Sequence, residues 1–234
     1  MIGHALALGP RASARLAWDR WIAAGFAIGS ACFFIGPFPG FVQLIGQGAD
    51  AVVFFAGSLF FTLAAGLEVR EATLRLGRRW SANASWWSAA IQFVGTLLFN
   101  ISTFDAMLTG LSSHQQNRLV WAPDLIGSGC FLVSGWLAYA VTTGPHLLHA
   151  RWLPERRDRA WKMAAVNLTG CVLFGVSAIA SYVVPSTGSA LALAPANWST
   201  ALGALCFFIG AVLLLRRKPD APRATASPLV SQEV

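Results

Sequence analysis

The sequence predicts an all-α, polytopic membrane protein built as a bundle of six transmembrane helices. The 234-residue chain is 56% hydrophobic and only 12% charged, and its mean hydropathy of +0.58 is too high for an ordinary soluble domain. Six stretches of about 20 residues are nearly free of charge, which is enough to cross a hydrocarbon core of roughly 30 Å. The basic residues, finally, lie in alternate loops.

The six stretches define the predicted spans and the division of the chain. We place the spans at about 19–37, 50–68, 86–105, 121–141, 161–183 and 197–215. Ten of the eleven prolines lie between the spans, at their edges or in the tails, and Pro123 lies in a first helical turn, so we expect unbroken helices. Residues 19–215 then form the transmembrane domain, between an N-terminal segment (1–18) and a polar, disordered tail (216–234).

The distribution of basic residues predicts the orientation. Of 17 Lys and Arg residues, 16 precede the first span, lie in the second and fourth loops or follow the sixth span, which leaves only Arg118 for the other loops. This asymmetry predicts that both termini are cytoplasmic, and we expect a bacterial plasma membrane. The first span follows no long signal-like apolar core, so we expect it to stay as an anchor. The net charge of +7 then reflects topology and attraction to anionic lipid headgroups at the cytoplasmic loops, with no nucleic-acid partner.

Every predicted span carries one copy of the pattern G-x-x-x-F-x-x-small, an internal repeat that we call the stripe. Its glycines are Gly29, Gly57, Gly95, Gly127, Gly170 and Gly203, and its phenylalanines are Phe33, Phe61, Phe99, Phe131, Phe174 and Phe207. The small residues are Gly36, Ala64, Ser102, Ser134, Ser177 and Gly210. Offsets of 0, +4 and +7 lie on one face of a helix.

The stripe predicts close helix packing. Membrane helices associate where small residues let their backbones approach, and a phenylalanine fills the space beside a neighbour's glycine. We therefore interpret the twelve glycines and phenylalanines as helix-packing residues, with the opposite faces, such as Val53, Leu97 and Leu213, toward lipid or an oligomer partner. The alternative is that the stripe lines a pore, where phenylalanines would form a hydrophobic gate.

The spacing of the stripe suggests three tandem two-helix hairpins. Equivalent glycines are 66 and 75 residues apart in odd spans and 70 and 76 apart in even spans. With segments such as Ile28-Gly29-Ser30 and Leu125-Ile126-Gly127-Ser128, residues 19–215 resemble tandem copies of the YrhK-like membrane module. The serine is replaced in spans three, five and six by Thr96, Cys171 and Ala204. The resemblance implies a two-helix membrane fold and no particular activity.

Polar residues on the stripe face predict a cluster near the cytoplasmic side. Gln92 and Asn167 lie three residues before their stripe glycines on helices that run in the same direction, so their depths match. Glu68 lies eleven residues past Gly57 on the same face of span two. We expect Glu68, Gln92 and Asn167 to lie close together and to form interhelical hydrogen bonds. Alternatively, Glu68 pairs with Arg70 or an arginine of a neighbouring loop.

Three acidic residues mark the outer side. Asp50 and Asp124 lie near predicted helix N-termini, where a carboxylate caps free N–H groups, and Asp105 lies at a helix end. The alternative to capping is an acidic vestibule that gathers cations.

The sequence contains no phosphate-binding loop, nucleophile elbow or zinc-protease motif. The four cysteines lie inside spans and are interpreted as packing residues, and the His146-x-x-His149 pair lacks a clear third metal ligand. We therefore expect no enzyme activity, no metal and no cofactor. The predicted role is structural or partner-binding, in contact with the lipid bilayer and with a second copy or another membrane protein. The alternative is a small channel or carrier for ions or small solutes.

Overall fold

A computed structural model describes residues 10–77, 83–143 and 159–216, with side chains from residue 17 onward. His146, His149 and the predicted tail from residue 217 onward lie outside the described residues. The described chain is helical apart from turns and one two-stranded hairpin, so the predicted all-α class is confirmed. The long helices are α1 (Pro10–Ile35), α3 (Gln47–Leu76), α4 (Ala84–Asp105), α6 (Ala122–Thr143), α7 (Arg159–Ala180) and α8 (Leu193–Leu215).

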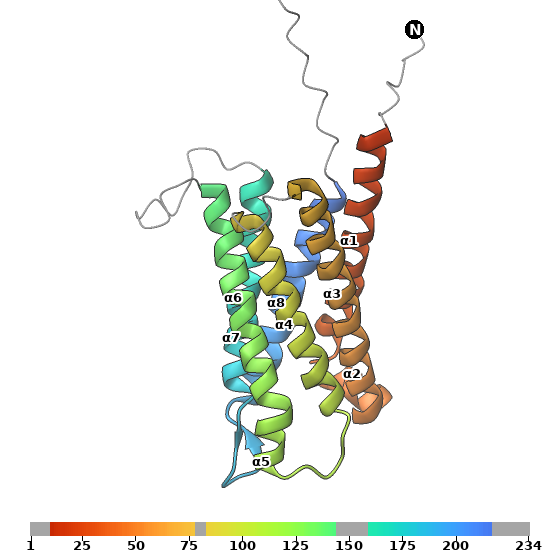
Figure 1. Cartoon of the computed structure of the whole chain (residues 1–234). Coiled ribbons are helices and arrows are strands. Elements are labelled where there is room, and N and C mark those ends of the chain that lie inside the picture. The colour runs from red at the N-terminus through yellow and green to blue at the C-terminus, as the bar shows by residue number, and fades with distance from the viewer. Residues whose placement is uncertain (1–9, 78–82, 144–158, 217–234) are drawn as a thin grey trace, which may run out of the picture.

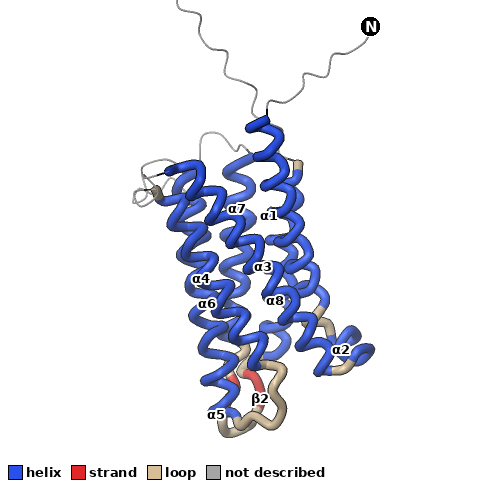
Figure 2. The backbone as a smooth tube through the Cα atoms, turned by 45° about the vertical axis from the view of Figure 1, so that its right-hand side comes forward, coloured by secondary structure: helices blue, strands red, loops and turns tan. Residues whose placement is uncertain are grey.

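These long helices run alternately up and down and form a closed ring (Figures 1 and 2). Each packs against the long helix before it and the one after it, and α8 packs against α1 to close the ring. We call the end at which α1, α4 and α7 begin the basic end, because Arg70, Arg75, Arg159 and Arg216 lie there. The ring places one face of every helix toward a common axis.

Several of these helices have the length and composition of membrane spans. Within the described residues, four helical stretches are long and apolar enough to cross a membrane, Gln47–Leu76, Ser113–Thr143, Arg159–Ala180 and Leu193–Leu215. A fifth is obtained if the bent pair Ala17–Ile35 and Pro39–Ile45 counts as one span. Helix α4 is not among them, since Trp86, Trp87, Gln92 and Asn100 lower its mean hydropathy. These helices are compatible with an integral membrane protein.

The connections at the other end contain structure that the sequence analysis did not predict. Helix α2 (Pro39–Ile45) follows α1 after a bend of 92°, with Pro39 in its first turn and a turn at Gly46, whose φ of 82° favours glycine. A capping box at Ser112 begins α5 (Ser113–Gln116), which continues through a π-helical turn η2 (Asn117–Trp121) into α6. Between α7 and α8, β1 (Val183–Val184) pairs antiparallel with β2 (Ser189–Ala190).

The short hairpin is attached to the ring by one amide. The Asn117 side chain donates a hydrogen bond to the Val183 carbonyl at 2.7 Å and accepts one from the Val183 N–H at 2.9 Å. The Trp121 indole donates to the Ala178 carbonyl at 2.8 Å. At the end opposite the basic end, hydrogen bonds therefore join η2 both to α7 and to the α7–α8 connection.

Candidate functional site

The stripe residues face the interior of the ring. All six stripe phenylalanines are buried, with exposed fractions of 2–6%, and together they form the hydrophobic core. All six stripe glycines are buried as well. Of the residues expected on the opposite faces, Leu97 is 41% exposed, whereas Val53 and Leu213 are half-buried.

Stripe glycines and stripe phenylalanines contact each other reciprocally in three helix pairs, α1–α3, α4–α6 and α7–α8. A Cβ added to Gly95 would lie 2.8 Å from the Phe131 ring, and one added to Gly127 would lie 2.9 Å from the Phe99 ring. The same exchange joins α1 to α3 and α7 to α8, through Gly29 with Phe61, Gly57 with Phe33, Gly170 with Phe207 and Gly203 with Phe174. Only a residue without a Cβ fits at these contacts without a shift of its neighbour.

The six phenylalanines meet on the ring axis as two groups of three. Phe33, Phe99 and Phe174 come from α1, α4 and α7, and their ring centroids are 5.9–6.3 Å apart. On α3, α6 and α8, Phe207 lies 5.8 Å from Phe61 and 5.9 Å from Phe131. Because consecutive helices are antiparallel, the second group lies nearer the basic end. We call these two groups of three rings the phenylalanine layers, and they fill the middle of the ring of helices.

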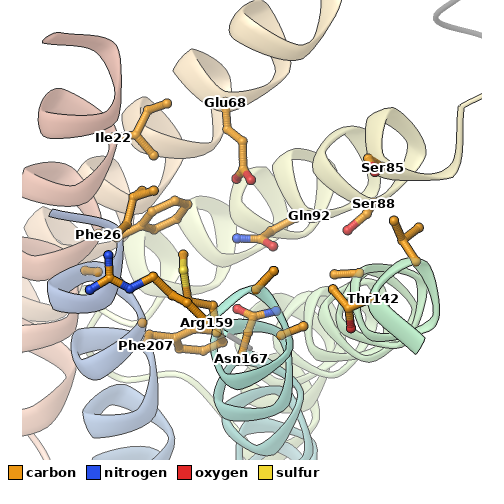
Figure 3. A pocket seen from close by; sticks show the side chains of 18 residues that line it. Ile22, Phe26, Glu68, Ser85, Ser88, Gln92, Thr142, Arg159, Asn167 and Phe207 are labelled. Atoms are coloured by element: carbon orange, nitrogen blue, oxygen red, sulfur yellow. The ribbon is translucent and has the colours of Figure 1, made fainter. Parts of the chain in front are cut away.

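A pocket of about 440 Å³ opens between the second phenylalanine layer and the basic end (Figure 3). Its inner limit includes Phe207, and apolar walls come from Ile22, Phe26, Met163 and Leu214. Its polar lining includes Glu68, Gln92, Asn167, Ser88 and Arg159. The volume lies within the range of roughly 300–1,000 Å³ that is usual for small-molecule sites.

The three residues of the predicted polar cluster therefore line one cavity. Figure 3 shows Glu68, Gln92 and Asn167 extending from three different helices toward the same space. Their positions along the ring axis follow from the helical rise of about 1.5 Å per residue. The reference level is the midpoint between the stripe glycine and the stripe phenylalanine of each helix. Gln92 and Asn167 lie roughly 7–8 Å and Glu68 roughly 13–14 Å from that level, toward the basic end.

The cluster is only partly hydrogen-bonded. The Gln92 Oε1 accepts a hydrogen bond from the Ser134 hydroxyl at 3.2 Å, and the Ser88 and Ser134 hydroxyls each donate to the other residue's carbonyl. The Asn167 amide nitrogen lies 3.9 Å from the Cys171 sulfur. No hydrogen bond joins Glu68, Gln92 and Asn167 to one another among the described residues. Their remaining polar atoms face the pocket, where a ligand can reach them.

The charged groups of the pocket are Glu68 and Arg159. The Glu68 carboxylate accepts no hydrogen bond from the described residues, and Arg70, one candidate partner, has its guanidinium 4.5 Å from the centre of the Trp18 ring. Arg75, in the last turn of α3, has a favourable charge interaction with Glu68, and Arg78 and Arg79, in the neighbouring loop, lie outside the described residues. Arg159 lies at the rim and donates to the main-chain carbonyl of Arg216, just past the end of α8.

The predicted outer acidic residues lie on separate helices at the opposite end. Asp50 is in the first turn of α3, but the cap residue is Gly46 and one Asp50 oxygen is buried without a hydrogen-bond partner in the described structure. Asp124 lies in the first turn of α6, which continues from α5 and η2 as one helical stretch that begins at Ser113. Asp105 is the last residue of α4. None of the three carboxylates makes a hydrogen bond with another described residue.

Sequence reasoning missed three pocket residues. Ser88 lies four residues before Gln92, and Gly210 occupies the third stripe position of its helix, so helical periodicity could have found them. Gly210 is unlike the stripe glycines, since an added Cβ would meet nothing within 4 Å. Arg159 had no such signal, because the sequence alone did not show that α7 begins above the pocket.

Comparisons with known proteins add no assignment to this site. No protein-family model, curated protein or solved structure matches the chain.

Proposed function

We propose that this protein is a non-enzymatic integral membrane bundle of six spans, with a structural or partner-binding role. The six long helices each supply one inward stripe, and α4 fits this scheme despite its lower hydropathy because its polar residues Gln92 and Asn100 face neighbouring helices or the pocket. Asn100 accepts a hydrogen bond from Thr62 of α3 at 3.2 Å. Satisfied polar side chains of this kind are tolerated inside a membrane bundle.

We further propose that the bundle consists of three tandem hairpins, α1–α3, α4–α6 and α7–α8. The reciprocal glycine and phenylalanine contacts recur in each pair, and each hairpin contributes one ring to each phenylalanine layer. The YrhK-like module remains a hypothesis for the origin of this unit. In the same proposal the basic end faces the cytoplasm, following the positive-inside rule, and the basic residues there contact anionic headgroups.

The observation that carries the non-transporting role is the pair of phenylalanine layers across the axis. Six buried aromatic rings in mutual contact leave a dry middle to the ring, and a hydrophobic constriction opposes the passage of ions and water. The pocket reaches the second layer from the basic end. In this proposal it is a blind cavity and not a segment of a conduction path.

A flux experiment tests this function. Purified protein is reconstituted into lipid vesicles, and the movement of potassium, protons and a small neutral solute is followed with entrapped fluorescent reporters. We expect rates equal to those of empty vesicles for the native chain. Native flux that falls in Asp50→Asn or Glu68→Gln would refute the sealed bundle and support a channel or carrier.

The carrier remains the second candidate because, within the part of the chain that the structure describes, a polar pocket reaches into the ring from the basic end. Access from one side at a time is the arrangement that alternating-access carriers use, with the phenylalanine layers as the closed gate. In that case flux would appear only for the solute that fits the pocket. The ligand of the pocket is therefore the question that matters for both candidates.

A further inference from the structure

We propose that the pocket at the basic end binds a small organic molecule with a primary ammonium group, which pairs with Glu68. This inference goes beyond the non-enzymatic role proposed above and requires binding only, not transport. It rests on the pocket volume, on the unsatisfied polar atoms in its lining and on the position of its single acid.

The lining has the composition of a small-molecule site. Apolar side chains from α1, α7 and α8 form much of the wall, and a few polar groups converge from α3, α4 and α7. Open space is present beside Gly210, where an added Cβ would meet no atom within 4 Å. An apolar body of a few carbons fits beside this glycine.

The polar atoms that remain available favour a ligand that donates hydrogen bonds. Glu68 offers two acceptor oxygens with no hydrogen bond from the described residues, and the Asn167 carbonyl oxygen offers another acceptor. Gln92 has its Oε1 engaged by Ser134, which leaves its amide nitrogen as a donor. An ammonium group has three donors and one positive charge, so it satisfies a carboxylate and an amide oxygen together.

Two other ligand classes fit less well. A divalent cation such as Ca²⁺ takes six to eight oxygen ligands, usually with several carboxylates, whereas Glu68 is the only acid in this lining. An anion would have to rely on Arg159, which lies at the rim, is exposed and already donates to the Arg216 carbonyl. The negative charge of Glu68 lies deeper and would repel an anion that entered past the rim.

Calorimetric titration of the full-length protein in detergent tests the proposal with three probes of similar length. The probes are n-butylammonium, which has only the ammonium group, norvaline, which adds a carboxylate, and valerate, which has only the carboxylate. We expect saturable binding of n-butylammonium or norvaline and none of valerate. Stronger binding of norvaline that is lost in Arg159→Gln would identify an amino acid, and equal binding of both amines would identify a simple amine.

Two variants and one control locate the binding. Glu68→Gln keeps the shape of the side chain and should weaken amine binding by at least about tenfold, because a charge-assisted hydrogen bond is lost. Gly210→Leu places a bulky side chain in the space where an added Cβ meets no atom within 4 Å, and it should abolish binding. The control Asp105→Asn removes a carboxylate at the other end of the ring and should bind as the native chain does.

Three results would overturn the proposal. They are the absence of saturable binding by either amine, valerate binding as tight as that of the amines, and unchanged amine affinity in both Glu68→Gln and Gly210→Leu. Because binding is measured in detergent, it does not depend on flux. Flux in vesicles would contradict the non-transporting role, and the absence of amine binding in detergent would contradict the ligand proposal. Amine binding without flux would support both.

Discussion

Replacing Gly29 by alanine tests whether the stripe glycines hold helices together. An added Cβ at Gly29 would lie 2.8 Å from the main-chain oxygen of Gly57 and 2.9 Å from the Phe61 ring. Such contacts are several tenths of an ångström too short, and a backbone oxygen inside a helix cannot turn away as a side-chain end can. Helix α1 must therefore move away from α3, which separates the rings that Gly29 and Gly57 accommodate.

The magnitude follows from two opposing terms. Overpacking typically costs about 1–3 kcal/mol, and the gain in helix propensity from glycine to alanine is up to about 1 kcal/mol. Gly210→Ala is the matched control, since it gains the same propensity in α8 but its Cβ meets nothing within 4 Å. In the difference between the unfolding free energies of the two variants, the shared gain in helix propensity cancels. The remaining difference is the cost of overpacking at Gly29, which we expect to be about 1–3 kcal/mol.

Reversible unfolding in mixed micelles, followed by circular dichroism, measures this difference. Leu97→Ala, on an exposed face of α4, adds a second comparison and should be mild because no packed cavity opens there. Leucine at Gly95 or Gly127 should be more destabilising than alanine at Gly29, since more atoms must be accommodated. The packing role of the stripe is refuted if the unfolding free energies of Gly29→Ala and Gly210→Ala differ by less than about 0.3 kcal/mol, which is the agreement expected of independent sites.

Three further substitutions probe single polar groups. Asn117→Ala removes both hydrogen bonds to Val183 and should destabilise the α7–α8 connection by about 1–3 kcal/mol. The loss should be seen as faster hydrogen exchange of the Val183 amide. Unchanged exchange would show that the Asn117 side chain does not hold this connection in place. Ser134→Ala should cost about 1 kcal/mol, because its hydroxyl bonds the Ser88 carbonyl and the Gln92 amide oxygen. Ser30→Ala should not lower the unfolding free energy in the same mixed-micelle measurement, because the buried Ser30 hydroxyl has no partner in the described structure. Equal losses of stability in Ser30→Ala and Ser134→Ala would contradict the role given to the Ser134 hydrogen bonds.

The predictions that succeeded depended on helical geometry alone. The polar cluster needed only a count of residues from the stripe glycines along antiparallel helices, and Glu68, Gln92 and Asn167 do line one pocket. The inward position of the phenylalanines followed from their offset of four residues. The spacing of residues along each helix does not show which helices are neighbours, so the closure of the ring by α8 and α1 was not predictable from it.

The prediction for Asp124 depended on where its helix begins. The predicted span starts at about residue 121, whereas a capping box of Ser112 with Gln115 starts the helical stretch eleven residues before Asp124, through hydrogen bonds of 2.9 and 3.3 Å. That S-x-x-Q signal was present in the sequence. The short hairpin after α7 is different, because its strands have only two residues each and its position depends on the distant amide of Asn117.

The seam between α8 and α1 has a consequence for the order in which the protein is assembled. All the other ring contacts join helices that are consecutive along the chain, so each forms as soon as the later helix has been synthesised. The α7–α8 contact and the seam both form only with the last helix, and the seam alone joins the last helix to the first. Asn167 and Gly210 both belong to the final hairpin, as do Phe174 and Phe207, so a chain synthesised only as far as α6 has four of the six stripe phenylalanines and no enclosed pocket. The pocket is therefore completed only when the last hairpin joins the other four helices.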